Sequence, residues 1–194
     1  MDIYLVRHGK TTATEKELYC GRTDLPLSPG GAAEITALKR CGTYPLSADL
    51  FFTSGMMRTE QTVDIIYGNV PRKAVPNIAE YDFGSFEMLS HEELKERDDY
   101  QSWLTDKSNG VPCPGGESKK QFGERAIAGF RRIINDLDSA GSFSAFVACH
   151  GGAIACIMTY LKPNTQGFYE WLPAPGHGYM LTLANGLLQQ YKRL

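Results

Sequence analysis

Ile3-Tyr4-Leu5-Val6-Arg7-His8-Gly9 is the stretch that decides the fold, because a short apolar run gives way within one residue to polar ones. Such a run is typical of a buried β-strand. The segment 145–149 repeats this pattern and ends in His150-Gly151-Gly152. Functional residues often follow the carboxyl ends of strands in open α/β sheets. The two histidines are therefore the first candidates for a functional site.

Strands and helices are predicted to alternate along the rest of the chain. Helix-start signals occur at Ser28-Pro29, at Ser54, and at two capping boxes, Ser90 with Glu93 and Ser118 with Gln121. Further strands are predicted at 50–53 and on both sides of the turn Asn185-Gly186, which favours a hairpin. This alternation predicts an α/β fold, a three-layer α/β/α sandwich with a mostly parallel central sheet.

No repeat, linker or low-complexity segment divides the sequence. We therefore expect one domain over residues 1–194, with a small cap formed by loop and helical insertions over about 81–116. The cap is expected to include the loop 109–116, which is rich in proline and glycine.

Composition excludes some classes of partner. The 20 lysines and arginines and 22 acidic residues give a net charge of −2, which argues against a broad nucleic-acid-binding surface. No apolar stretch approaches the roughly 18 residues that a spanning helix needs, so a membrane role is not expected. Five cysteines without C-x-x-C spacing, and the lack of a signal-like segment, favour the cytoplasm. The sequence leaves the oligomeric state open.

The two strand ends and a nearby cation suggest one site. Arg58 is predicted near the first turn of the helix that follows a third strand, so it would approach His8 and His150. Guanidinium groups match the oxygens of a phosphate monoester with paired, planar donors. Taken singly, each residue has an ordinary reading as a core or surface group, but their joint pattern favours a phosphate site.

Five ordered blocks resemble the histidine phosphatase (phosphoglycerate mutase-like) superfamily. They are Leu5 to Thr11; Gly21 to Ser28; Thr53-Ser54 with Arg58-Thr59 and Gln61-Thr62; Glu80 with Phe83-Gly84 and Pro114 to Ser118; and His150-Gly151-Gly152. An R-H-G tripeptide alone is a weak signal, whereas five blocks in order over nearly the whole chain are a strong one.

The resemblance implies a role for each matched residue. His8 would attack phosphorus, and Arg7, Arg58 and His150 would hold the three non-bridging oxygens. Glu80 would protonate the leaving alkoxide and later deprotonate the water that hydrolyses phosphohistidine. Gly21 and Gly151 complete the expected substrate-binding set.

No metal or other cofactor is expected, because the arginines would supply the positive charge. One further expectation is a hydrogen bond from His8 to a backbone carbonyl, which would keep its nucleophilic nitrogen unprotonated.

Three further residues have two readings each. Glu87 is either a second acid or an anchor for a loop through backbone hydrogen bonds. His177 either borders the pocket or belongs to the approach to the last hairpin. Cys149, in an apolar strand, is expected to be a small buried hydrophobe rather than a nucleophile.

The resemblance includes both mutases and phosphatases. Mutases of the phosphoglycerate type carry an arginine pair in the cap that grips the substrate carboxylate, whereas segment 81–116 has only Arg97, Lys95 and Lys107 as lysines and arginines. Cys20 also departs from the threonine that mutases tend to have before the matching glycine. Hydrolysis of a small phosphate monoester is therefore favoured over phosphoryl transfer to a second position.

Within the phosphatases, Phe83 to Met88 and Tyr100 to Leu104 resemble α-ribazole phosphatases of cobalamin biosynthesis. An aromatic cap would suit a flat benzimidazole ring, but Phe83, Phe86 and Trp103 could equally pack the cap against the sheet. A broad-specificity sugar or metabolite phosphatase is the alternative. A non-catalytic module that binds phosphorylated ligands is a hypothesis of another class.

Overall fold

The computed structural model describes residues 1–194 and contains a six-stranded sheet with the order β3-β2-β4-β1-β5-β6. The strands are β1 (Asp2–Arg7), β2 (Leu50–Thr53), β3 (Lys73–Ala74), β4 (Ser144–Cys149), β5 (Gly178–Ala184) and β6 (Leu187–Arg193). The β1–β4, β2–β4 and β2–β3 pairs are parallel, and β5 pairs antiparallel with β1 and β6. The predicted mostly parallel sheet is confirmed.

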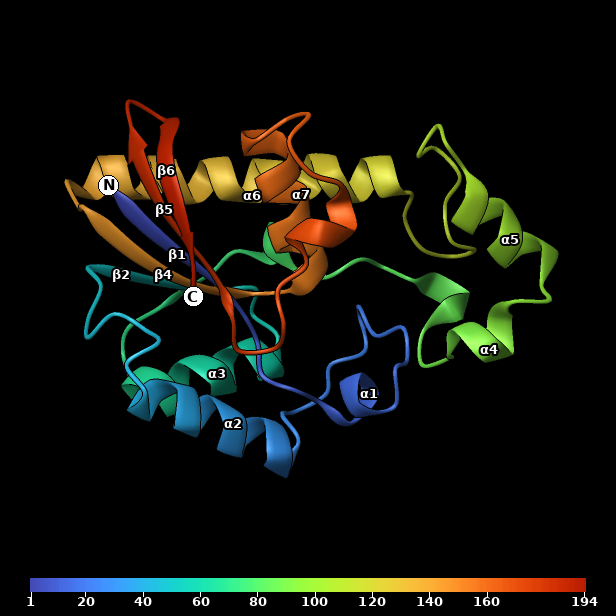
Figure 1. The fold of residues 1–194 in the computed structure, drawn as a ribbon, viewed down its shortest axis with the longest axis horizontal. Helices are drawn as coiled ribbons and strands as arrows, with labels where there is room; N and C mark the ends of the chain where they lie inside the picture. Colours follow the sequence, from blue (N-terminus) through green and yellow to red (C-terminus); the bar gives the residue numbers. More distant parts are fainter.

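Helices cover both faces of this sheet (Figure 1). The helices are α1 (Thr12–Glu15), α2 (Pro29–Arg40), α3 (Met57–Tyr67), α4 (His91–Leu94), α5 (Asp98–Thr105), α6 (Lys119–Ala140) and α7 (Gly151–Leu161). Short 3₁₀ turns span Pro76–Ile78, Gly84–Phe86 and Phe168–Trp171. Helices α2 and α3 lie on one face and α6 and α7 on the other, which confirms the three-layer sandwich. No helix combines the length and apolar character that crossing a membrane requires.

The alternation of side chains in β4 explains why this strand is apolar throughout. Ala145, Val147 and Cys149 join a buried cluster with residues of α6 and α7. Phe146 and Ala148 point the other way, into a cluster with residues of α2 and α3. Because both faces of the strand are buried, a continuous apolar run is what a central parallel strand needs.

The capping and turn signals mostly form as predicted. Ser28 caps α2 by accepting from the Gly31 N–H, with proline in the first turn, and capping boxes form at Ser90 and Ser118. The hairpin turn has φ 52° at Asn185 and 73° at Gly186. Both values lie in the left-handed region that a type I′ turn requires.

The predicted Ser54 cap is wrong. Helix α3 starts two residues later than expected, with Met56 at the N-cap and no side-chain cap. The Ser54 hydroxyl instead contacts His150 (2.8 Å) and Thr59 (3.1 Å), and it accepts from the Met56 N–H only over a long 3.4 Å. Helix α1, which Thr11 caps, and the short strand β3 were not predicted.

Candidate active site

His8 follows the end of β1, and its ring orientation is set by its own backbone neighbour. Its Nδ1 atom lies 2.7 Å from the Gly9 carbonyl oxygen. A carbonyl can only accept, so Nδ1 carries the proton and Nε2 keeps its lone pair. Burial, and next the positive charge of Arg58, lower the pKa of His8 to about 3. The predicted hydrogen bond is therefore present, with Gly9 as its acceptor, and the ring is neutral near pH 7.

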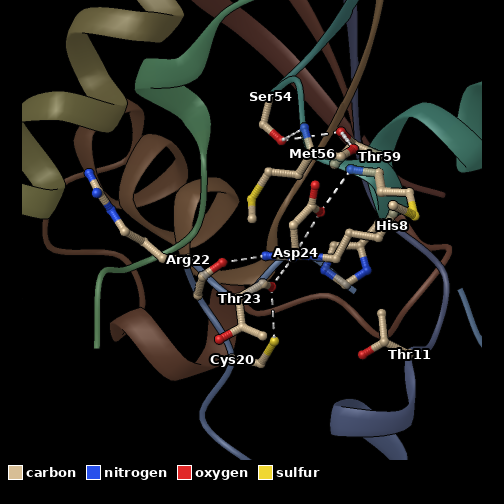
Figure 2. Close-up of polar contacts among 12 residues, drawn as sticks. His8, Thr11, Cys20, Arg22, Thr23, Asp24, Ser54, Met56 and Thr59 are labelled. Atoms are coloured by element: carbon tan, nitrogen blue, oxygen red, sulfur yellow. Dashed lines mark hydrogen bonds and ion pairs between the residues drawn. The ribbon is translucent and has the colours of Figure 1, made fainter. Parts of the chain in front are cut away.

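Arg58 brings a buried cation to the same point. It projects from the first turn of α3, is 1% exposed, and donates from Nη2 to the Gly21 carbonyl (2.7 Å) and from Nη1 to the Thr23 carbonyl (2.9 Å). These bonds tie the 20–24 loop to α3, and Figure 2 shows Asp24 of this loop between Thr23 and His8 in this view. Burial lowers the pKa of Arg58, but a guanidinium stays protonated in proteins.

Arg7, at the end of β1, has one unsatisfied donor. Its Nη1 donates to the Pro173 carbonyl (2.8 Å), while its buried Nε has no acceptor. Buried donors without partners are rare and call for an explanation. A Cβ built on Gly151, the first residue of α7, would lie 3.2 Å from Nε, so the guanidinium lies against the start of that helix. An anionic ligand would satisfy this donor.

His150 directly follows β4 and lies next to His8, with ring centroids 5.0 Å apart. It is fully buried. Its Nε2 lies 2.8 Å from the Ser54 hydroxyl, and Arg58 donates from Nε to its Nδ1 over a long 3.4 Å. Burial, and next the proximity of His8, lower the pKa of His150 well below its ordinary value. Without a ligand, this histidine is neutral.

Glu80 is held by two backbone donors. Its carboxylate accepts from the Gly152 N–H (3.0 Å) in the first turn of α7 and from the Tyr81 N–H (3.0 Å). A Cβ at position 152 would collide with this carboxylate, so the close approach requires glycine. The start of α7 therefore carries His150 and also holds the Glu80 carboxylate, through Gly152.

These groups meet at a cavity of about 170 Å³. It is lined by Arg7, His8, Thr11, Thr14, Glu17, Leu18, Cys20, Arg58 and Glu80. Four of the predicted site residues therefore share one cavity. His150 and Gly151 lie behind it, and the N–H of Gly21 is bound to Glu87, so contacts of these three with substrate stay predictions.

The structure gives a structural role to each of the three further residues considered in the sequence, Glu87, His177 and Cys149. Glu87 accepts from the N–H groups of Gly21, Arg22 and Thr23, which confirms that it anchors a loop. The His177 ring contacts the Leu194 carbonyl (2.9 Å), at the end of the last hairpin. Cys149 is fully buried and burial raises the pKa of its thiol, as expected of a small hydrophobe.

The large aromatic side chains of segment 81–116 do not line the cavity. Phe86, Tyr100 and Trp103 are at most 6% exposed and pack together in a third buried cluster. Packing is thus confirmed for Phe86 and Trp103. Phe83 is half-buried and packs on Tyr19, with ring centroids 4.9 Å apart.

Sequence reasoning missed the wall of the cavity formed by residues 11–20. The side chains of this wall lie in or beside the short helix α1 and belong to Thr11, Thr14, Glu17 and Leu18. This helix was not predicted, because its sequence resembles that of a loop. Ser54 was quoted in the motif but assigned to a helix cap. It follows the end of β2 as His8 follows β1 and His150 follows β4, and this shared position was the available signal.

Comparison with known proteins identifies a family and several relatives of this chain. The profile of the histidine phosphatase superfamily (branch 1) matches residues 3–181. The 2,3-bisphosphoglycerate-dependent phosphoglycerate mutase 1 of Arabidopsis thaliana is 29% identical over 199 residues, 84% of this chain and 58% of the mutase, so the chain spans under two thirds of that relative. The adenosylcobalamin/α-ribazole phosphatase of Salmonella typhimurium is 29% identical over 166 residues, 83% of this chain and 79% of that phosphatase.

A solved structure gives the same fold. The crystal structure of the α-ribazole phosphatase from Shigella flexneri has a TM-score of 0.83 at 22% identity, covering 97% of this chain and 93% of that one. The superfamily profile spans most of the sequence, and the residues of the R-H-G motif lie at the end of β1 beside the second histidine. The chain therefore belongs to the histidine phosphatase superfamily (branch 1).

Proposed function

We propose that this protein hydrolyses phosphate monoesters through a phosphohistidine formed on His8. The observation that carries the proposal is a neutral, buried imidazole whose Nε2 is unprotonated, in a cavity with the buried guanidinium of Arg58 and the half-buried Arg7, whose buried Nε has no acceptor. A dianionic phosphoryl group would neutralise this charge and accept the free hydrogen bond. Positioning and charge stabilisation are what phosphoryl transfer chiefly requires.

The first half-reaction forms one bond and breaks another. The Nε2 lone pair of His8 attacks phosphorus in line with the ester oxygen, the phosphorus–oxygen bond breaks, and the leaving alkoxide takes a proton from Glu80. Arg7 and Arg58 stabilise the charge on the non-bridging oxygens. An incoming dianion also raises the pKa of His150, so that its ring can donate a proton or a hydrogen bond to the third oxygen.

The second half-reaction restores the enzyme. The Glu80 carboxylate takes a proton from water as the water oxygen attacks phosphorus, the phosphorus–nitrogen bond breaks, and inorganic phosphate leaves. His8 regains its lone pair and Glu80 its proton. Since the two guanidinium groups supply the positive charge, no metal or other cofactor takes part in the proposed reaction.

Hydrolysis is favoured over mutase activity by the charges around the cavity. The only cations that line it are Arg7 and Arg58, which the phosphate would occupy. The other lysines and arginines of segment 81–116, which are Lys95, Arg97 and Lys107, do not line it. A small phosphate monoester with an uncharged alcohol is the substrate class that fits.

We further propose that residues 1–194 form one histidine phosphatase domain in which segment 81–116 acts as the cap. Glu87, within this segment, anchors the 21–23 loop beside the cavity. α-Ribazole 5′-phosphate, acted on in cobalamin biosynthesis, is the proposed substrate, and it rests on the named relatives and on the half-buried Tyr19 and Phe83 pair. A broad-specificity sugar or metabolite phosphatase is the second candidate, because most cap aromatics are buried.

Initial-rate hydrolysis in EDTA tests the activity and the substrate together. The panel compares α-ribazole 5′-phosphate with sugar phosphates, 3-phosphoglycerate and p-nitrophenyl phosphate. We expect turnover of the phosphate monoesters in EDTA, with kcat/KM for α-ribazole 5′-phosphate higher by at least about 100-fold, the scale of about 3 kcal/mol of differential transition-state binding. A flat profile would favour the broad-specificity candidate, and no turnover on any ester would favour the phospholigand-binding module.

The cavity rim gives a second test. Glu17 is exposed, lines the cavity and adopts φ 55°, a conformation that favours glycine. The negative charge of Glu17 would repel a second anionic group on the substrate and so weaken its binding. Glu17→Lys is expected to raise the kcat/KM ratio of 3-phosphoglycerate to glycerol 3-phosphate by about 5- to 10-fold, the scale of 1–2 kcal/mol between charges near a surface. 3-Phosphoglycerate has a carboxylate where glycerol 3-phosphate has an uncharged hydroxymethyl group.

Glu124→Lys is the matched control, since it changes the net charge equally on the exposed side of α6. It should leave the ratio unchanged. An equal rise in both variants would assign the effect to overall charge, and no rise in Glu17→Lys would remove Glu17 from substrate selection.

A further inference from the structure

Arg125 lies on α6, outside the cavity, and uses three of its five donors on the segment that carries Glu80. Its Nη1 donates to the carbonyls of Asn77 (2.8 Å) and Ala79 (3.0 Å), and its Nη2 donates to the carbonyl of Glu80 (3.1 Å). The remaining donors bind the two carboxylate oxygens of Glu117 (2.5 and 3.2 Å). The five N–H groups of the guanidinium thus have five acceptors.

Glu117 also binds the segment that carries Glu80, at Tyr81 and Asp82. Its Oε1 accepts from the Asp82 N–H (2.8 Å), and its backbone carbonyl accepts from the Tyr81 hydroxyl (2.6 Å). The side chains of Arg125 and Glu117 are 26% and 15% exposed, and the guanidinium lies 5.2 Å from the centre of the Phe122 ring. A shielded ion pair therefore holds the backbone of 77–82 by its carbonyls and by one of its N–H groups.

Segment 77–82 has little regular structure of its own to keep it in place. It contains most of one short 3₁₀ turn, Pro76–Ile78, and then residues without regular secondary structure up to Asp82. The Glu80 side chain is fixed at its carboxylate by Gly152, but its backbone position depends on Arg125. General acids act only when they lie within hydrogen-bond reach of the atom they protonate, so a shift of this backbone would affect one step more than the others.

We infer that Arg125, with Glu117, is a positioning residue that sets how efficiently Glu80 protonates the leaving group. The inference rests on the proposed function. A lysine at position 125 would keep the positive charge, but its ammonium group has fewer donors than a guanidinium and lacks their planar arrangement. It could therefore satisfy only part of this set of acceptors. Arg125→Lys should therefore impair protonation of poor leaving groups while phosphate binding and attack by His8 persist.

The test compares two leaving groups in a double-mutant cycle with Glu80→Gln. Glycerol 3-phosphate needs a proton on its alkoxide, whereas p-nitrophenolate leaves without one. General acid catalysis contributes about 10²- to 10⁴-fold, so partial misplacement in Arg125→Lys should lower kcat/KM for glycerol 3-phosphate by about 10- to 100-fold and for p-nitrophenyl phosphate by less than about 3-fold. The ratio kcat/KM is compared because it reports only the steps up to the phosphohistidine, before Glu80 acts as a base. In the Glu80→Gln background, Arg125→Lys should add less than about 2-fold, since the group it positions is gone.

A purely structural role would give different results. Equal losses on the two esters, or additive losses in the double variant, would overturn the inference. Arg131→Lys is the matched control on α6, where Arg131 contacts only Tyr160. It should leave both rates unchanged. If Arg125→Lys does not fold, Glu117→Gln should show the same dependence on the leaving group, and its absence would count against the inference.

Failure of the proposed function has its own signature. If Glu80→Gln alone lowers kcat/KM equally for the two esters, Glu80 is not the general acid, and both the mechanism and the inference fall. If Glu80→Gln shows the expected dependence and Arg125→Lys does not, only the inference falls.

Discussion

His8→Ala is expected to abolish phosphatase activity, with a loss in kcat of at least about 10³-fold, since removing a covalent nucleophile is among the largest single losses measured in enzymes. The ring is neutral, its Nδ1 is bound to Gly9, and its Nε2 is the only unprotonated ring nitrogen among the cavity-lining residues. Alanine offers no group that can accept the phosphoryl. Steady-state hydrolysis of p-nitrophenyl phosphate measures the loss directly.

Covalent labelling makes this prediction sharper. A rapid acid-free quench of the wild-type protein with phosphorus-labelled substrate should trap an acid-labile label, and His8→Ala should trap none. His177→Ala is the matched control, because His177 contacts the Leu194 carbonyl and does not line the cavity. A label that persists without His8 would assign the nucleophile to another residue.

Arg58→Ala should lower kcat/KM by about 10²- to 10³-fold, the loss typical of removing one buried charge-stabilising donor from a transition state. The guanidinium lines the cavity in which we propose that phosphate binds, and it ties the carbonyls of Gly21 and Thr23 to α3. Without it, two backbone acceptors lose their partners, which costs about 1–3 kcal/mol per buried group. The thermal midpoint should fall together with the rate.

Arg58→Lys separates charge from geometry. Lysine restores a cation but not the paired donors, so recovery of affinity without recovery of kcat would indicate that the planar fork stabilises the transition state. Arg22→Ala is the matched control in the same loop, since Arg22 is exposed and pairs with Asp82. Its kcat/KM should remain within a factor of about two, because surface ion pairs contribute little. Equal losses in Arg22→Ala and Arg58→Ala would attribute the effect to the loop alone.

The sequence predicted those parts of the site that depend on local pattern. The strands before His8 and His150 are apolar because both of their faces are buried, and polar residues begin where the strands leave the core. The capping boxes at Ser90 and Ser118 depend on residues three positions apart, so they too are visible in the sequence.

What the sequence could not predict depends on contacts between distant segments. Ser54 has the composition of a helix cap, yet it bonds to His150, 96 positions away. Arg125 resembles any other charged residue of a long helix, and its five acceptors lie on 77–80 and on Glu117. Glu17 gives no periodic signal at all. Each of these roles follows from tertiary placement rather than from propensity.

The layered architecture divides the chemistry between two separately packed cores. The α6 and α7 layer holds Glu80, the proposed acid, through Arg125 and Gly152, while the α3 layer contributes Arg58, the proposed phosphate-binding cation. His8, the proposed nucleophile, follows a strand of the sheet between them. The volume of the side chains in each core is therefore expected to affect a different step of the proposed reaction. A change of volume in the α6 and α7 core would move Glu80 and alter which alcohols are released, and a change in the α2 and α3 core would move Arg58 and alter the affinity for the phosphoryl group, without any substitution in the cavity itself.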